Sequence, residues 1–202
     1  MVESAAATTL DQHKENLLAF AKKHLDAYDT YNVVLTSSKV PGLEVRQTKD
    51  ADVGGTVVTI SKGTIAGLTV DKYKEFKENI VTHTPVLDPK LTMTKMEDCE
   101  GHIVTHTHIK MPMFMTDRSI FNLYFQYEDA DGSWVDLCSY HGTEAIAESE
   151  AGKKLAGKNV VGQNIIDYRI LTPTEDGCNF ISILCTDVGG SLPVALQNQG
   201  AG

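Results

Sequence analysis

The chain has 202 residues, of which 42% are hydrophobic and 22% are charged, as in an ordinary globular protein with a sizeable core. The formal net charge of −9 argues against nucleic-acid binding, which needs a basic face, and against strong attraction to anionic membranes. The length favours one domain.

The sequence shows no sign of export or membrane insertion. No basic stretch followed by an apolar run opens the chain, and no segment approaches the ~20 apolar residues of a spanning helix. None of the cysteines forms a Cys-x-x-Cys pair, so reduced, buried thiols are expected at Cys99, Cys138, Cys178 and Cys185. We therefore expect a soluble, cytoplasmic protein.

Two amphipathic helices are predicted in the first half of the chain. The first runs from Leu10 to about Tyr28, after a small, polar tail at residues 1–9 that we expect to be flexible. The second runs from Thr69 to about Val81 and is followed by a Pro-Val-Leu-Asp-Pro turn.

Alternating apolar and polar residues predict strands around these helices. They lie at residues 33–35, 43–47, 56–66, 91–98, 102–110, 119–127, 133–141, 161–172 and 178–187. Gly63 is expected to form a bulge, and residues 142–160 form either a short helix or a mobile loop. A final helix at Leu192–Gln197 is short. The order predicts an α+β architecture, with residues 10–202 as a single domain.

The most informative segment is a loop between the two strands that run from His102 to Gln126. It carries Met111, Met113, Phe114 and Met115, whereas loops are normally polar. These side chains either plug a core or gate a hydrophobic cavity. Methionine suits a gate, because its flexible, polarisable side chain adapts to variable partners.

Three motifs, taken in order, are similar to those of a known family. They are K-M-P-M-F-M-T-D-R-S-I-F at 110–121, D-V-G-G-S-L-P at 187–193 and L-D-P at 87–89. Over roughly residues 10–197 the chain resembles the START (StAR-related lipid transfer) domain, which has the helix-grip fold.

The resemblance implies a curved antiparallel β-sheet around a hydrophobic cavity, flanked by N-terminal and short C-terminal helices. Family members bind, and often transfer, a single hydrophobic ligand without catalysis. The resemblance therefore implies a sterol, phospholipid, fatty acid or carotenoid as partner, a gate at residues 111–116, transient membrane contact and no cofactor.

The chain departs from the family pattern at three places. Leu87 stands where the family usually has Trp. Thr105 and Tyr124 stand where sterol-type members place an acid and an arginine, so hydroxyls replace that ion pair. The chain ends one or two helical turns after Pro193, so we expect a second chain, as in a homodimer, or a bound ligand to help cover the groove.

The side chains that face the cavity follow from strand alternation. On the first strand the mostly apolar set is Ile103, Thr105, Thr107, Ile109 and Met111. On the next strand, apolarity alone would turn Phe121, Leu123, Phe125 and Tyr127 inward, whereas the family register turns Asn122 and Tyr124 inward. We follow the family register, because the first helix can bury the other face. The predicted ligand-binding residues are Ile103, Thr105, Thr107, Ile109, Met111, Met113, Phe114, Met115, Asn122 and Tyr124.

Other polar residues carry weaker signals. His102, His106 and His108 share one face of a strand, but no acid or thiol lies at a metal-ligand spacing, so we expect an exposed polar face and no metal. We interpret Asp117 and Arg118 as structural, with Asp117 capping a turn and Arg118 binding a carboxylate or carbonyls.

The leading functional hypothesis is a non-enzymatic carrier of one hydrophobic molecule. A first alternative is a cyclase- or aromatase-like enzyme that uses Tyr124 and a cavity histidine as acid and base. A second alternative is an interaction module whose groove takes a partner's helix.

Overall fold

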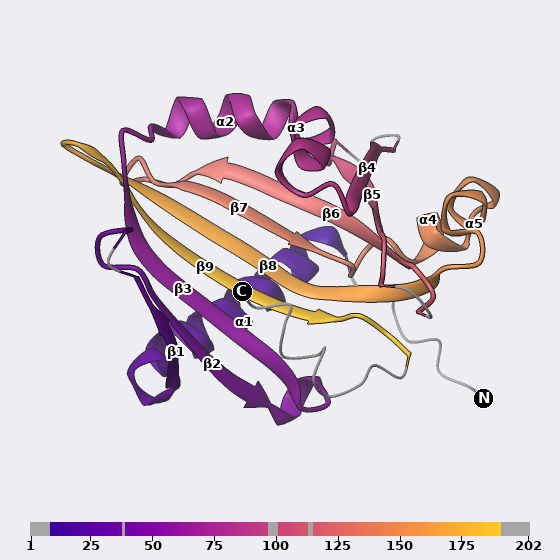
Figure 1. Cartoon of the computed structure of the whole chain (residues 1–202), viewed down its shortest axis with the longest axis horizontal. Helices are drawn as coiled ribbons and strands as arrows, with labels where there is room; N and C mark the ends of the chain where they lie inside the picture. Colours follow the sequence, from indigo (N-terminus) through magenta and orange to yellow (C-terminus); the bar gives the residue numbers. More distant parts are fainter. Residues whose placement is uncertain (1–8, 38, 97–100, 113–114, 191–202) are drawn as a thin grey trace.

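The computed structural model describes residues 9–37, 39–96, 101–112 and 115–190 (Figure 1). The helices are α1 (Leu10–Asp26), α2 (Val70–Glu78), α3 (Ile80–Leu87), α4 (Glu144–Glu148) and α5 (Glu150–Ala156), with 3-10 turns η1 (Tyr28–Thr30) and η2 (Ala51–Val53). The strands are β1 (Asn32–Thr36), β2 (Glu44–Asp50), β3 (Thr56–Ala66), β4 (Leu91–Lys95), β5 (Val104–Ile109), β6 (Arg118–Glu128), β7 (Trp134–Ser139), β8 (Val160–Thr174) and β9 (Gly177–Asp187).

The described strands form one curved nine-stranded sheet in the order β1-β2-β3-β9-β8-β7-β6-β5-β4 (Figure 1). Neighbouring strands in this order are antiparallel. Because β7 is much shorter than β6 and β8, these two strands meet beyond its end and pair in parallel from Arg118 and Val160 onward. The α+β helix-grip arrangement predicted from the sequence is confirmed.

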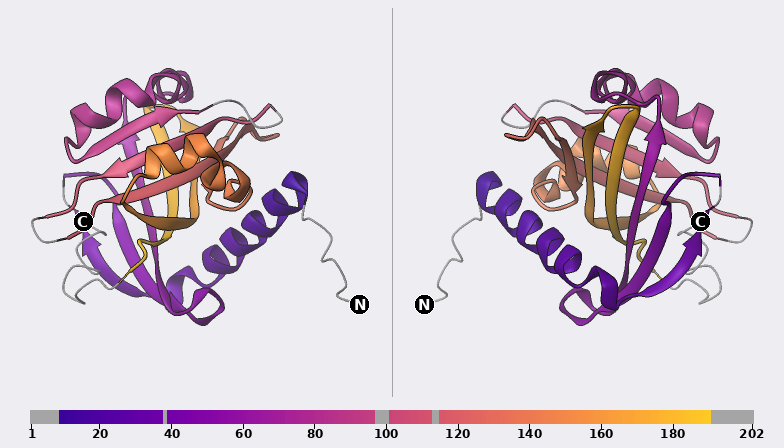
Figure 2. Two further views of the ribbon diagram at one scale, coloured as in Figure 1. Left: turned by 90° about the vertical axis from the view of Figure 1, so that its right-hand side faces the viewer. Right: turned by 90° about the vertical axis from the view of Figure 1, so that its left-hand side faces the viewer.

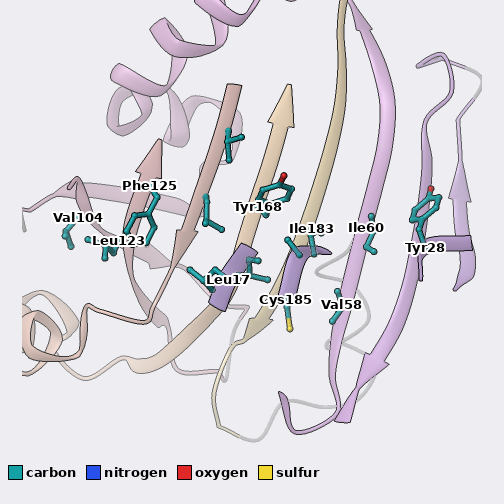
Figure 3. Packing of buried hydrophobic residues seen from close by; sticks show 14 residues of the cluster. Leu17, Tyr28, Val58, Ile60, Val104, Leu123, Phe125, Tyr168, Ile183 and Cys185 are labelled. Atoms are coloured by element: carbon teal, nitrogen blue, oxygen red, sulfur yellow. The ribbon is translucent and has the colours of Figure 1, made fainter. Parts of the chain in front are cut away.

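The sheet has two differently covered faces, which we call the α1 face and the α2 face after the helices that lie on them (Figure 2). On the α1 face, Leu17 and Ala21 of α1 pack with apolar residues from the central strands (Figure 3). This core includes Val58, Ile60, Val104, Leu123, Phe125, Val135, Leu137, Ile166, Tyr168, Ile183 and Cys185. The α1 face therefore supplies the main hydrophobic stabilisation.

A buried polar contact fastens α1 to the end of β2. His24 is 1% exposed, and its Nε2 lies 2.8 Å from Asp50 Oδ2 while its Nδ1 lies 2.8 Å from the Tyr31 hydroxyl. Lys23 Nζ donates to the same carboxylate at 2.6 Å. Burial raises the pKa of Asp50, whereas the hydrogen bonds and the charge of Lys23 lower it. The lowering effects outweigh burial, so the pKa of Asp50 lies below its ordinary value. The contacts fix how α1 crosses the sheet.

The second helix differs from the prediction. Asn79 ends α2, and its side-chain amide donates to the Glu75 carbonyl at 3.0 Å, which satisfies an otherwise open helix end. The chain then starts α3, which runs through Pro85 to Leu87. The prediction of a rigid turn from Pro85 onward was therefore wrong, because the φ that proline fixes, about −65°, is also that of an α-helix.

Two further expectations are resolved by the structure. The bulge expected at Gly63 is absent from the described strand β3, which pairs in unbroken register with β2 and β9. Residues 142–160 hold two short helices, separated by Ser149, whose hydroxyl accepts from the Gly152 N–H at 3.0 Å and caps α5. The helix expected at Leu192–Gln197 and residues 1–8 of the expected tail lie outside the described residues. Thr9, expected to belong to the flexible tail, instead caps α1, and its hydroxyl accepts from the Gln12 N–H at 3.2 Å.

None of the helices in the described part of the chain is long and apolar enough to span a membrane.

Truncating the α1-face core should destabilise the protein. Leu123 is fully buried there, so Leu123→Ala should lower the free energy of unfolding by about 2–5 kcal/mol. Val34→Ala, at a side chain that is 50% exposed, should change it by no more than about 0.5 kcal/mol. Urea denaturation of the two variants measures both values, and equal losses would contradict this assignment of the core.

Candidate functional site

A pocket of about 280 Å³ lies on the α2 face, between α2 and the strands β3, β8 and β9. Its lining is largely apolar, with a few polar side chains, and consists of Ser61, Ile65, Leu68, Tyr73, Arg169, Leu171, Phe180, Ile181 and Ser182. Pockets that bind small molecules in proteins share this composition, and this volume lies at the lower end of their range.

Strand register brings the polar lining residues together. Ser61 pairs with Ser182, and Ser182 pairs with Arg169, so the three side chains form a row across β3, β9 and β8. Gly63 faces Phe180 in the same way, and a Cβ on Gly63 would lie only 2.8 Å from the Phe180 ring. The missing side chain leaves room for the aromatic ring, which lines the pocket.

Beside the pocket lies a buried charge, the carboxylate of Asp136 on β7. Lys77 Nζ is 2.7 Å away, the Tyr73 hydroxyl donates at 2.7 Å, and Gln126 Nε2 donates at 3.0 Å. Burial disfavours the charged carboxylate, but Lys77 and the hydrogen bonds outweigh burial and lower the pKa of Asp136. Burial raises the pKa of Tyr73, and so does Asp136.

A second ion pair extends the cluster into the pocket. Arg169 Nη2 donates to Asp167 Oδ2 at 2.7 Å. Asp167 raises the pKa of Arg169, so the guanidinium stays charged. The Arg169 side chain is 38% accessible, because it lines the pocket, whereas the Asp167 side chain is 18% accessible.

Sequence reasoning missed this ionic cluster. At Thr105 and Tyr124 the chain does carry hydroxyls, as noted from the sequence. A buried carboxylate occurs on β7 instead, and a partly buried ion pair occurs on β8. The signal was present, since Asp136 interrupts an apolar run and Asp167 and Arg169 alternate with Ile and Tyr. Charged residues at strand alternation within a central strand indicate a shared polar face.

The predicted residues Thr105, Asn122 and Tyr124 also lie on the α2 face, opposite to the core residues Leu123 and Phe125. They are closed off, with exposures of 1%, 7% and 7%. Lys77 Nζ lies 4.7 Å from the centre of the Tyr124 ring, and Asn164 Nδ2 donates to Asn122 Oδ1 at 3.0 Å.

A register shift in β8 makes the Asn164 contact possible. The pairing with β9 slips between Asn164 and Ile166, so Asn164 and Asp167 face α2 while Ile166 joins the α1-face core. Without the shift, Asn164 and Ile166 would share one face.

The other predicted residues lie nearer the margin. Thr107 is buried, Ile109, Met111 and Met115 are half-buried and Ile103 is 37% exposed. Met113 and Phe114 lie outside the described residues. The pocket under α2 is lined by other side chains, so a ligand role for the whole predicted set stays a prediction.

Asp117 and Arg118 hold the two ends of the predicted gate loop. Asp117 accepts from the Met111 N–H at 2.9 Å and lies 2.9 Å from His108 Nε2, and these contacts lower its pKa. Arg118 donates to the carbonyls of Thr116, Val188 and Gly189. The structural interpretation of this pair is confirmed.

The exposed polar face expected for the β5 histidines was wrong. His106 is 4% exposed, and its Nε2 lies 3.0 Å from the Ser119 hydroxyl, which also accepts from Asn159 Nδ2 at 3.0 Å. The segment after α5 therefore covers this end of the α1 face. His102 packs edge-on against Phe125.

The thiols of Cys138, Cys178 and Cys185 are free and buried, and Cys99 lies outside the described residues. Within the described ranges, no group of three or more His, Cys, Asp or Glu side chains could hold a metal ion.

A second pocket, of about 300 Å³, lies on the α1 face. It is lined by His13, Asn16, Leu17, Phe20, Val53, His141 and Ile165. The rings of His13 and His141 stack at its rim with centres 6.0 Å apart.

No family model matches the chain, and no curated protein matches its sequence. Solved structures match its fold with probability 1.00. Human StAR-related lipid transfer protein 5 matches with a TM-score of 0.67 and 15% identity, over 95% of this chain and 89% of that one. Human STARD10 matches with a TM-score of 0.70 and 10% identity, over 99% of this chain and 76% of that one.

A bacterial STAR-related lipid transfer protein, from Xanthomonas axonopodis, matches with a TM-score of 0.61 and 12% identity, over 84% of this chain and 88% of that one. Such low identities show the fold alone. The chain has the START-like helix-grip fold.

Stability should decrease as the pH falls from about 7 toward 5. Burial lowers the pKa of His24 and of His106 below the ordinary 6.5 in the folded state. As the pH falls, the unfolded chain therefore protonates these two histidines before the folded protein does. The contribution of the neutral histidines to the free energy of unfolding is complete above pH 6.5 and is lost as the pH falls through the folded-state pKa. Urea denaturation at about pH 7.5 and about pH 5.5 measures the loss. His106→Asn should show a smaller loss, and a loss equal to that of the unmodified protein would exclude His106 as a source.

Removing the Asp117 carboxylate should loosen the predicted gate loop. Asp117→Ala deletes the acceptor of the Met111 N–H, so that amide should exchange its hydrogen severalfold faster. Asp117→Asn keeps an acceptor oxygen and serves as the matched control. Unchanged exchange at Met111 in the Ala variant would show that the carboxylate does not hold the loop.

Proposed function

We propose that this protein binds one hydrophobic or amphiphilic molecule, of the size of a single lipid, on the α2 face of its sheet and catalyses no reaction on it. The observation that carries the proposal is the pocket under α2 within a START-like fold. The solved structures with this fold include proteins named for lipid transfer.

The lining of the pocket suits such a ligand. Ile65, Leu68, Leu171 and Phe180 would contact apolar parts of the molecule, and Arg169 would contact a polar part. Burial of apolar surface would contribute about 25 cal/mol per Å² to affinity. Sterol, phospholipid, fatty acid and carotenoid remain as ligand classes, with residues 111–116 as the gate.

An exposed apolar corner supports transient membrane contact during loading. Val86 and Leu87 at the end of α3 are 80% and 72% exposed. The Lys110 N–H donates to the Lys90 carbonyl at 2.8 Å, which places this corner beside the start of the gate loop at Met111. Apolar side chains beside lysines fit a membrane interface.

The geometry favours a carrier over the enzyme alternative. Tyr124 is 7% exposed and faces α2, whereas His106 on the neighbouring strand lies on the α1 face. Burial raises the pKa of Tyr124 well above its ordinary value, which makes its hydroxyl a poor general acid. Turnover that Tyr124→Phe abolishes while ligand binding survives would favour the enzyme instead.

Native mass spectrometry of the freshly purified protein, followed by extraction, tests the proposal. One bound lipid or pigment per chain is the expected result, and the extract identifies its class. An empty protein that also ignores a broad panel of lipids would contradict the proposal.

Filling the pocket should weaken binding. Ile65 lines the pocket and is 40% exposed, so Ile65→Trp should fold and lower the affinity for a neutral hydrophobic dye by about tenfold. Val33→Trp, at a side chain 50% exposed on β1, is the matched control. Dye fluorescence measures both variants, and equal affinities would place the binding site elsewhere.

A further inference from the structure

Resting on the proposed function, we propose that the ligand is an amphiphile with an anionic head group, a carboxylate or a phosphate. Arg169 binds that head group, together with the hydroxyls of Ser61 and Ser182. The pocket under α2 holds this polar end of the ligand.

Arg169 is the charged residue among the side chains that line the described pocket. Its guanidinium has five N–H donors, and Nη2 donates to Asp167 Oδ2 at 2.7 Å. The side chain is 38% accessible and lines the pocket, so part of it can contact a ligand. A guanidinium fork matches the paired oxygens of a carboxylate or phosphate.

The two carboxylates of the cluster do not line the pocket. The side chains of Asp136 and Asp167 are 3% and 18% exposed, and neither residue lines the pocket. Asp136 is neutralised by Lys77, and Asp167 by Arg169. A ligand entering the pocket therefore meets the cation first, which disfavours a cationic head group.

Ser61 and Ser182 complete the donor set. Register places Ser61, Ser182 and Arg169 in one row, and directly opposed side chains on neighbouring strands have Cβ atoms about 4.5–5.5 Å apart. Both side chains line the pocket and are half-buried. Both can donate to the oxygens that Arg169 binds.

The apolar lining is continuous with this polar row. Phe180 lies two residues before Ser182 on β9, so both side chains are on the same face. Leu171 pairs with Phe180 on the neighbouring strand β8. A head group at Arg169 would therefore place the first carbons of an acyl chain against Leu171 and Phe180.

The experiment compares ligands that share one acyl chain and differ in the head group. Palmitate, palmityl alcohol and palmitoyl lysophosphatidic acid each displace a neutral hydrophobic dye from the full chain. We expect at least one anionic ligand to bind about tenfold or more tightly than the alcohol, as a charge-assisted hydrogen bond requires. If palmitate binds more tightly than palmitoyl lysophosphatidic acid, the head group is a carboxylate, and the reverse order indicates a phosphate.

Variants assign the preference to named residues. Arg169→Gln combined with Asp167→Asn removes the cation without leaving a lone buried carboxylate, and should abolish the preference while the alcohol still binds. Ser61→Ala combined with Ser182→Ala should reduce the preference for the anionic ligand severalfold. This double variant tests the proposal even if the variant at Arg169 and Asp167 does not fold. Lys62→Gln is the matched control, because Lys62 is next to Ser61 but lies over the Tyr28 ring on the other face.

Each outcome separates the two proposals. Equal binding of acid, phosphate and alcohol would overturn the anionic head group and leave the proposed function standing. A preference that survives in both the arginine and the serine variants would overturn the assignment to this row. Failure of all the ligands and the dye to bind would overturn the proposed function itself.

Discussion

The arrangement of this protein depends on the buried carboxylate of Asp136. Lys77 and Tyr73 reach it from α2, and Gln126 reaches it from the neighbouring strand. An unpaired charge at this depth would cost several kcal/mol, so folding requires α2 to lie across the middle of the sheet. The same contact makes Tyr73 a wall of the pocket, so one ion pair both stabilises the helix and forms the candidate site.

The sheet separates stabilisation from recognition. Its α1 face holds the apolar core around Leu123 and Ile183, whereas its α2 face holds the ionic cluster and the pocket. Both faces of β6 are buried, and for this reason apolarity alone could not decide which of them faces a ligand. A protein with a sufficient core on one side can place Arg169 and its serine neighbours on the other, where the proposed head group would contact them.

The strands could be predicted well because alternation and turn residues are local signals. The bounds of β3 and most of β6 follow from them, and so does the orientation of Asp117 and Arg118 as loop anchors. The burial of His106 was not predictable in this way, because it depends on Asn159, a residue from a distant connection. The break at Asn79 was also missed, since a helix face continues through it in sequence.

By itself, the sequence determined the order of the strands and of the two longest helices, and which residues share a face in strands without an irregularity, because these follow from backbone periodicity over a few residues. Only the tertiary structure decided which element covers each face. The charged cluster combines Asp136 of β7, Arg169 of β8 and Lys77 of α2. Sheet register pairs Asp136 with Arg169, and the position of α2 brings Lys77 to Asp136. The register shift between Asn164 and Ile166, invisible to simple alternation, reverses the facing of the residues that follow it, so Asp167 and Asn164 lie on the same face of the sheet.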